Sequence, residues 1–226
     1  MSIEDKLIAT ANDLFREHGV LNVSMRQIIS EAGLSSNSVY RKVKNKEDIL
    51  LIILTRQYTV MRQVQSEIFS SKLNSREKLV SLIVLPAYQS FTSKFNFTEN
   101  YFMINRQLIN HCSSNAQQKW HEINLVTFSD VTNFINSCIE KGELEDICAS
   151  DMFLGVSTIC SGAMALVSQG ISVDSQSEYI KKNAALMNNF LSQYHWNEEN
   201  ISYSLDNILR LMRTLCDQRT RLAPFF

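Results

Sequence analysis

The residues of this sequence most suited to binding chemistry are four cations that lie close together. They are found between residues 34 and 46 and comprise Arg41, Lys42, Lys44 and Lys46. No aspartate or glutamate falls in this stretch. Side chains of this kind neutralise phosphates, which supplies most of the sequence-independent affinity of a protein for nucleic acid. Because the net charge of the chain is −1, a nucleic-acid interface would depend on this local cluster.

The segment before the cations reads as a short helix that ends at a glycine. Its apolar residues recur at helical spacing on one face, and Gly19 follows as a natural left-handed helix terminator. The first helix is therefore predicted to end near His18. The apolar positions are Leu7, Ile8, Ala11, Leu14 and Phe15.

Two further short helices are predicted around a glycine turn. Ser24 stands three residues before Gln27, the spacing of a capping box in which each side chain satisfies a free amide. A helix over residues 25–32 follows, and Gly33 permits the positive φ of a sharp turn. A third helix is predicted over residues 36–43, with another beginning near residue 46. Two short helices across a tight turn, the second one basic, are typical of a DNA-binding helix-turn-helix.

The string LIATANDLFREHGVLNVSMRQIISEAGLSSNSVYRKVKNKEDIL resembles the N-terminal signature of the tetracycline-repressor (TetR) family. The resemblance covers about a fifth of the chain. Two departures occur: Asn37 stands where the family often has glycine, and Val43 replaces the usual aromatic residue. The resemblance implies a dimeric, all-α transcriptional regulator that binds operator DNA and a small-molecule effector.

The resemblance also implies roles for individual residues. Ser36, Asn37 and Arg41 would face base edges, and arginine can donate two hydrogen bonds to guanine, while asparagine can pair similarly with adenine. The residues expected to hold phosphates are Ser24, Tyr40, Lys42 and Lys46.

Two of these assignments, Tyr40 and Lys46, have alternatives. Tyr40 could instead be a core aromatic residue, since Val39 and Val43 flank it. A cation at a helix N-terminus is unfavourable to the helix dipole, so a phosphate partner better explains Lys46. Lys44 is expected to be a solvated loop charge.

Beyond residue 46 the sequence predicts architecture rather than chemistry. It contains six glycines and two prolines, few turn formers for a chain of this length, which favours long helices. We predict an all-α fold with a helix-turn-helix domain at residues 1–47 and a ligand-binding and dimerisation domain at residues 48–226. Capping pairs are expected at Asn74 with Glu77, Ser114 with Gln117 and Ser175 with Glu178. The predicted helices span residues 46–70, 75–94, 98–111, 114–141, 150–169, 175–196 and 201–218.

An effector pocket is predicted near Pro86, which interrupts an apolar run and should kink its helix. Aromatic and polar residues around it suit a largely apolar ligand with few orienting groups. The alternative is that the aromatic residues simply form the core. The predicted ligand-binding residues are Tyr88, Phe91, Phe102, Arg106, His111 and Trp120.

The resemblance to the TetR family implies a homodimer interface on the helices 150–169 and 175–196. The first has small residues that permit close helix approach, and the second has an apolar stripe; the alternative is that both are internal core helices. The uncharged stretch 152–173 is long enough to span a membrane, but its polar residues favour a buried or interface helix, so no membrane partner is expected. The small residues are Gly155, Ser157, Ser161, Gly162, Ala163 and Ala165, and the stripe comprises Ile180, Ala184, Met187 and Leu191.

The five cysteines form no CxxC pair and lack a histidine at zinc-finger spacing, so neither a disulfide framework nor a structural metal is expected. No cofactor is predicted. The N-terminal residues MSIEDKLIATANDLF lack the features of a secretory signal, and a cytoplasmic location is expected.

Three classes of function can be compared on these features. A DNA-binding repressor, released from a palindromic operator by an apolar effector, explains the basic helix, the glycine turn and the helical remainder together. An α-helical enzyme is the first rival, but no nucleophile–base pair, metal spacing or phosphate loop is evident. A helical interaction protein is the second rival, and an uncharged third helix would have favoured it.

Overall fold

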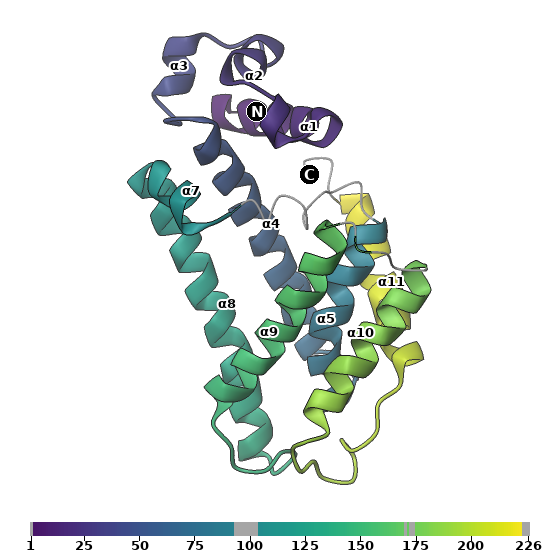
Figure 1. Cartoon of the computed structure of the whole chain (residues 1–226). Helices are drawn as coiled ribbons and strands as arrows, with labels where there is room; N and C mark the ends of the chain where they lie inside the picture. Colours follow the sequence, from purple (N-terminus) through teal and green to yellow (C-terminus); the bar gives the residue numbers. More distant parts are fainter. Residues whose placement is uncertain (1, 93–103, 170, 172–174, 223–226) are drawn as a thin grey trace. The chain divides into compact units, whose positions relative to one another are not determined.

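The computed structural model describes residues 2–92, 104–169, 171 and 175–222 (Figure 1). Over these residues the chain forms ten α-helices and one short 3-10 helix, and no strand beyond an isolated bridge between Leu144 and Trp196. The all-α class predicted from the sequence is confirmed.

The chain divides into two compact units, each built from separate parts of the sequence. Among the described residues, the first unit combines residues 2–60 with residues 104–124. It therefore contains the predicted domain 1–47 together with a segment that follows much later in the chain. Its helices are α1 (Ile3–His18), η1 (Val20–Asn22), α2 (Met25–Glu31), α3 (Ser36–Tyr40) and α7 (Arg106–His111), with the beginnings of α4 (Lys46–Phe69) and α8 (Ser114–Glu140).

Among the residues that the structure describes, the second unit comprises 61–92, 125–169, 171 and 175–222. Its helix α5 packs against α9, α10 and α11 (Figure 1). Leu79, Val80, Ile83 and Val84 of α5 are almost completely buried, and α5 continues as a helix through Pro86. The helices of this unit are α5 (Ser75–Thr92), α9 (Ala149–Ser168), α10 (Gln176–Leu191) and α11 (Leu205–Leu222), with the remainders of α4 and α8.

Several predicted helix ends differ from those in the structure. The helix predicted over 36–43 ends at Tyr40, and α10 ends at Leu191 rather than near residue 196. Within the segment predicted as helix 98–111, the described helix begins only at Arg106, and residues 98–103 lie outside the described part of the chain. The helix predicted from residue 201 begins at Leu205.

Two of the four predicted capping pairs are reciprocal in the structure. The capping box of Ser24 with Gln27 is present, and Asn74 with Glu77 also bond in both directions. Ser175 accepts from the amide of Glu178. The predicted pair of Ser114 with Gln117 is wrong, because the preceding Ser113 caps α8 and the side-chain Nε2 of Gln117 donates to the carbonyl of Cys112.

The apolar stripe predicted as an interface surface faces the protein's own core. Ile180, Ala184, Met187 and Leu191 are at most 4% exposed and pack in the second unit's hydrophobic cluster. That prediction is wrong for these four residues, because the helix buries its most apolar side against α5 and α9. Within α9, Gly155 also faces inward, and a Cβ there would overlap the Phe190 ring.

Candidate nucleic-acid interface

The helix-turn-helix is formed by α2 and α3, and its local geometry follows from the sequence. Gly33 has a φ of +59°, a left-handed conformation that glycine adopts without steric cost. Ser35 accepts a hydrogen bond from the amide of Ser38 and so caps α3. Ile28 and Val39 are completely buried, so the two helices are packed into the unit through their apolar sides.

The other side of α3 is open to solvent. Ser36, Asn37, Arg41 and Lys42 are all exposed, and among the described residues their side chains form no hydrogen bond or ion pair. These groups are therefore available to an external ligand, and two of them, Arg41 and Lys42, are cationic. Ser24, at the start of α2, is also exposed.

The structure excludes one of the two interpretations of Tyr40. Its side chain is 54% exposed, so it is not a core aromatic residue. Val43 is 2% exposed and fills core space, as expected of the residue that replaces an aromatic there.

Lys46 has partners that sequence reasoning missed. Its Nζ donates to the carbonyl oxygens of Val20 and Val23, at 2.8 and 2.9 Å. These bonds tie the start of α4 to the segment between α1 and α2, and they explain a cation at a helix N-terminus without a phosphate. An ammonium has three protons, so one remains for a further acceptor.

A second group of contacts joins the start of α4 to the turn between α7 and α8. Asp48 is 1% exposed, and its carboxylate accepts from the backbone amides of Lys44 at 2.7 Å and Ser113 at 2.6 Å. The carbonyl of His111 accepts from Asn45 Nδ2 at 2.9 Å and from Lys44 Nζ at 3.1 Å. We call these five residues the Asp48 joint. Lys44, expected to be a solvated loop charge, therefore has a specific partner.

Part of the Asp48 joint has a sequence signal that could have been found. Asn45 Oδ1 accepts from the amide of Asp48, and the spacing of three residues is that of a helix cap. The partners His111 and Ser113 carry no such signal, because they lie more than sixty residues away and bond through the backbone.

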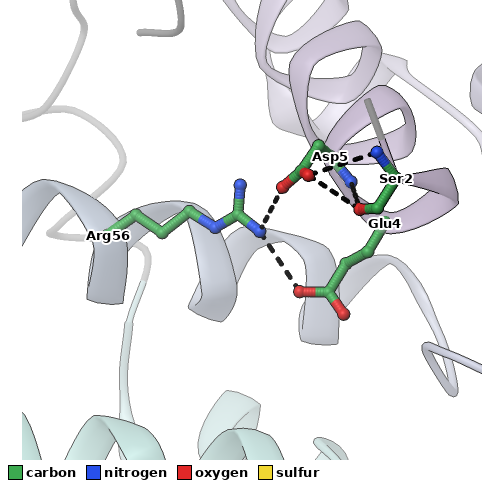
Figure 2. Close-up of polar contacts among 4 residues, drawn as sticks. All are labelled: Ser2, Glu4, Asp5 and Arg56. Atoms are coloured by element: carbon green, nitrogen blue, oxygen red, sulfur yellow. Dashed lines mark hydrogen bonds and ion pairs between the residues drawn. The ribbon is translucent and has the colours of Figure 1, made fainter.

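An ion-pair cluster holds the first turn of α1 against α4. Arg56 Nη2 lies 3.2 Å from Glu4 Oε1 and 3.1 Å from Asp5 Oδ1 (Figure 2). The hydrogen bond from the Ser2 side chain and, more weakly, the Arg56 guanidinium lower the pKa of Asp5. All three side chains are more than a third exposed, so the cluster orients α1 more than it stabilises it.

The predicted ligand-binding residues divide between the two units. Tyr88 packs against the core of the second unit, whereas Arg106, His111 and Trp120 belong to the first. Arg106 and His111 are exposed, at the two ends of α7. The side chain of Phe91 and the whole of Phe102 lie outside the described part of the chain.

Trp120 is among the residues that line a hollow in the first unit. Its ring packs edge-on against Tyr58, with centroids 5.2 Å apart. The hollow has a volume of about 530 Å³. Its lining comprises Ile109, Ser114, Gln117, Gln118, Trp120, His121 and Asn124. It therefore does not unite the predicted residues into one pocket.

Comparison with known proteins identifies the N-terminal region. Residues 7–53 match the family model described as bacterial regulatory proteins of the tetR family. The N-terminal region is a TetR-family domain. A search of curated proteins gave no match.

The fold of the TetR family extends over most of the chain. A TetR-family regulator from Syntrophomonas wolfei is 18% identical, with 83% of this chain and 94% of that one covered and a TM-score of 0.65. The regulator FadR from Bacillus subtilis, in complex with stearoyl-CoA, is 17% identical, with 84% and 98% covered and a TM-score of 0.63. The ketosteroid regulator KstR2 of Mycobacterium tuberculosis is 17% identical, with 83% and 94% covered and a TM-score of 0.57.

Proposed function

We propose that this TetR-type chain is a repressor that leaves a palindromic operator when a small, largely apolar effector binds. The observation that carries the proposal is the open face of α3, where Ser36, Asn37, Arg41 and Lys42 have no partner among the described residues. An exposed second helix with unpaired polar and basic groups suits the major groove of DNA. The solved relatives FadR and KstR2 are described with stearoyl-CoA and as a ketosteroid regulator, which supports an apolar effector here.

Within this proposal the seven DNA-binding residues have two kinds of role. Ser36 and Asn37 begin the exposed helix α3, and Arg41 follows it. These three residues therefore read bases. The residues that hold phosphates are Ser24, Tyr40, Lys42 and Lys46. Phosphate contacts fix the register of the protein on the duplex, whereas base contacts supply sequence selectivity.

We also propose that the protein is a homodimer through the exposed faces of α9 and α10. On α9, Leu154 is 65% exposed and Leu166 is 47% exposed; on α10, Leu186 is 52% exposed. By length and composition α9 could cross a membrane, and only 17% of its most apolar stretch is buried. An apolar face of this kind marks an interaction surface. A symmetric dimer would cover it and present two α3 helices to a palindromic site.

Selection of duplexes from a random library tests the proposed function directly. A regulator should enrich a palindromic sequence whose affinity exceeds that of random DNA by roughly 10³-fold or more. The binding constant should fall steeply with salt. An enzyme or a helical interaction protein would enrich no sequence, and that result would reject the proposal.

Replacing Lys46 with alanine tests whether its third proton reaches DNA. We expect weaker binding to the selected duplex and to random DNA alike, with a salt slope shallower by about one unit for each lost phosphate contact. Fluorescence anisotropy over a series of salt concentrations measures both. Lys72→Ala removes the same charge from an exposed position outside the helix-turn-helix and should leave the slope unchanged. If Lys46→Ala also leaves it unchanged, the ammonium serves only the Val20 and Val23 carbonyls.

A further inference from the structure

We propose that the turn between α7 and α8 positions the DNA-reading helix α3 through Asp48 and thereby sets sequence selectivity. This inference rests on the proposed function, because it concerns how that function depends on a distant segment of the chain. The turn comprises residues 111–113, and it contacts the chain immediately after α3 through the Asp48 joint.

The Asp48 carboxylate is held by backbone amides rather than by a cation. One oxygen accepts from Lys44 and the other from Ser113, at 2.7 and 2.6 Å. Hydrogen bonds to an ionised acceptor are stronger than those between neutral groups. Because Asp48 is almost fully buried, the loss of either amide would leave a buried charge undersolvated. The carboxylate therefore fixes the distance between Lys44 and Ser113.

Few residues separate the Asp48 joint from α3. The helix ends at Tyr40, and the amides of Lys42 and Val43 still donate to the carbonyl of Val39. The next residue, Lys44, already donates to Asp48. Val39 and Val43 are both at most 2% exposed, so their packing transmits a displacement of Lys44 to the exposed face of α3.

Cys112, at the centre of the turn, offers a measurement of the joint that does not involve DNA. It is 3% exposed and packs with Leu51 and Ala116. Burial and, to a lesser extent, the Asp48 carboxylate raise the pKa of its thiol to about 12. Since the thiolate is the reactive form, alkylation of Cys112 should require the turn to open, whereas the exposed Cys148 provides an internal reference.

Ser113→Pro removes the amide donor to Asp48. The preceding Cys112 has φ −73° and ψ 163°, in the extended region that a following proline requires. Ser114→Pro is the matched control, because Ser114 is the first residue of α8, where proline is favoured. Ser113→Ala is a second control, which removes the hydroxyl that caps Ala116 and keeps the amide.

We expect Ser113→Pro to lower the ratio of affinities for the selected and random duplexes by roughly 5- to 150-fold. This factor corresponds to the free-energy cost of leaving a buried acceptor without a hydrogen bond. Iodoacetamide should label Cys112 faster by a similar factor relative to Cys148, as measured by mass spectrometry. The salt slope should stay the same, because no phosphate contact is removed. Ser114→Pro should match the wild type in all three measurements, and Ser113→Ala should match it in the affinity ratio and the salt slope.

Other outcomes overturn the proposal. Faster labelling of Cys112 with an unchanged affinity ratio would mean that the turn does not position α3. An equal loss on both duplexes, together with a lower melting temperature, would assign the Asp48 joint to stability alone. If the wild type binds no duplex, the proposed function fails as well, whereas intact wild-type binding with an insensitive variant rejects only this inference.

A second pair of variants keeps the test decisive if Ser113→Pro does not fold. Asp48→Asn replaces one acceptor oxygen with an amino group that faces a backbone amide. Glu47→Gln removes the same charge from the adjacent residue of α4. The affinity ratio should fall for Asp48→Asn and stay unchanged for Glu47→Gln; a fall in both would indicate an effect of charge rather than of position.

Discussion

Replacing Gly162 with arginine should convert the proposed dimer into a folded monomer. A Cβ at Gly162 would meet no atom within 4 Å in its own protomer, so the fold tolerates the side chain. Gly162 lies one helical turn before Leu166 and two turns after Leu154, on the exposed face of α9. At a dimer contact the guanidinium would be buried without a partner, at a cost of roughly several kcal/mol. We expect the dissociation constant to rise by about a hundredfold or more, the equivalent of roughly 3 kcal/mol, as measured by analytical ultracentrifugation.

A second glycine of the same helix provides the contrast. Gly155→Ala should destabilise the protomer, because the added methyl group overlaps the Phe190 ring and overpacking of a core costs roughly 1 to 3 kcal/mol. Its melting temperature should fall, whereas that of monomeric Gly162→Arg should fall only by the loss of association. A Gly162→Arg variant that sediments as a folded dimer at micromolar concentration would place the interface elsewhere.

Replacing Arg41 with alanine should weaken binding to the selected operator far more than binding to random DNA. A bidentate contact with guanine contributes about 1 to 3 kcal/mol of discrimination, and a symmetric dimer makes it twice. The expected loss is therefore about 2 to 6 kcal/mol for the whole site. Arg41 is exposed just beyond α3 and has no side-chain partner among the described residues, so the fold should not change. Competition binding with operator and random duplexes measures the difference.

Lys42→Ala is the matched control, since it removes the neighbouring exposed cation. Because Lys42 is a proposed phosphate ligand, Lys42→Ala should lower the affinity for all DNA sequences equally and make the salt slope shallower. If Arg41→Ala behaves in the same way, Arg41 is a phosphate ligand and another residue reads the bases. If neither variant changes binding, α3 does not face the duplex.

The helix-turn-helix could be predicted from the sequence because its determinants are local. The Ser24–Gln27 capping box and the turn at Gly33 act within three or four residues, and such signals are read directly from spacing. The third helix was predicted too long because the basic residues after Tyr40 continue a helical pattern. In the structure Val43 instead serves the core.

The rest of the candidate site depends on contacts between distant segments. Lys46 bonds to carbonyls more than twenty residues earlier, and Asp48 to an amide 65 residues later. Backbone groups are present at every position, so no residue type reveals which of them will be used. The apolar stripe of α10 failed as an interface prediction for a similar reason, since periodicity identifies an apolar face without identifying what covers it.

The discontinuous first unit has a consequence for engineered chimaeras that exchange recognition modules between regulators. A fusion made at residue 47 separates Lys44 and Asn45 from Asp48, and it sets them against a foreign residue at the position of His111. Such hybrids should fold and yet read their new operator poorly. A transplant that carries residues 104–124 together with residues 2–60 keeps every contact of the Asp48 joint from one parent. The exchangeable module of this protein therefore consists of two separate segments of chain. The residues between these segments come from the recipient.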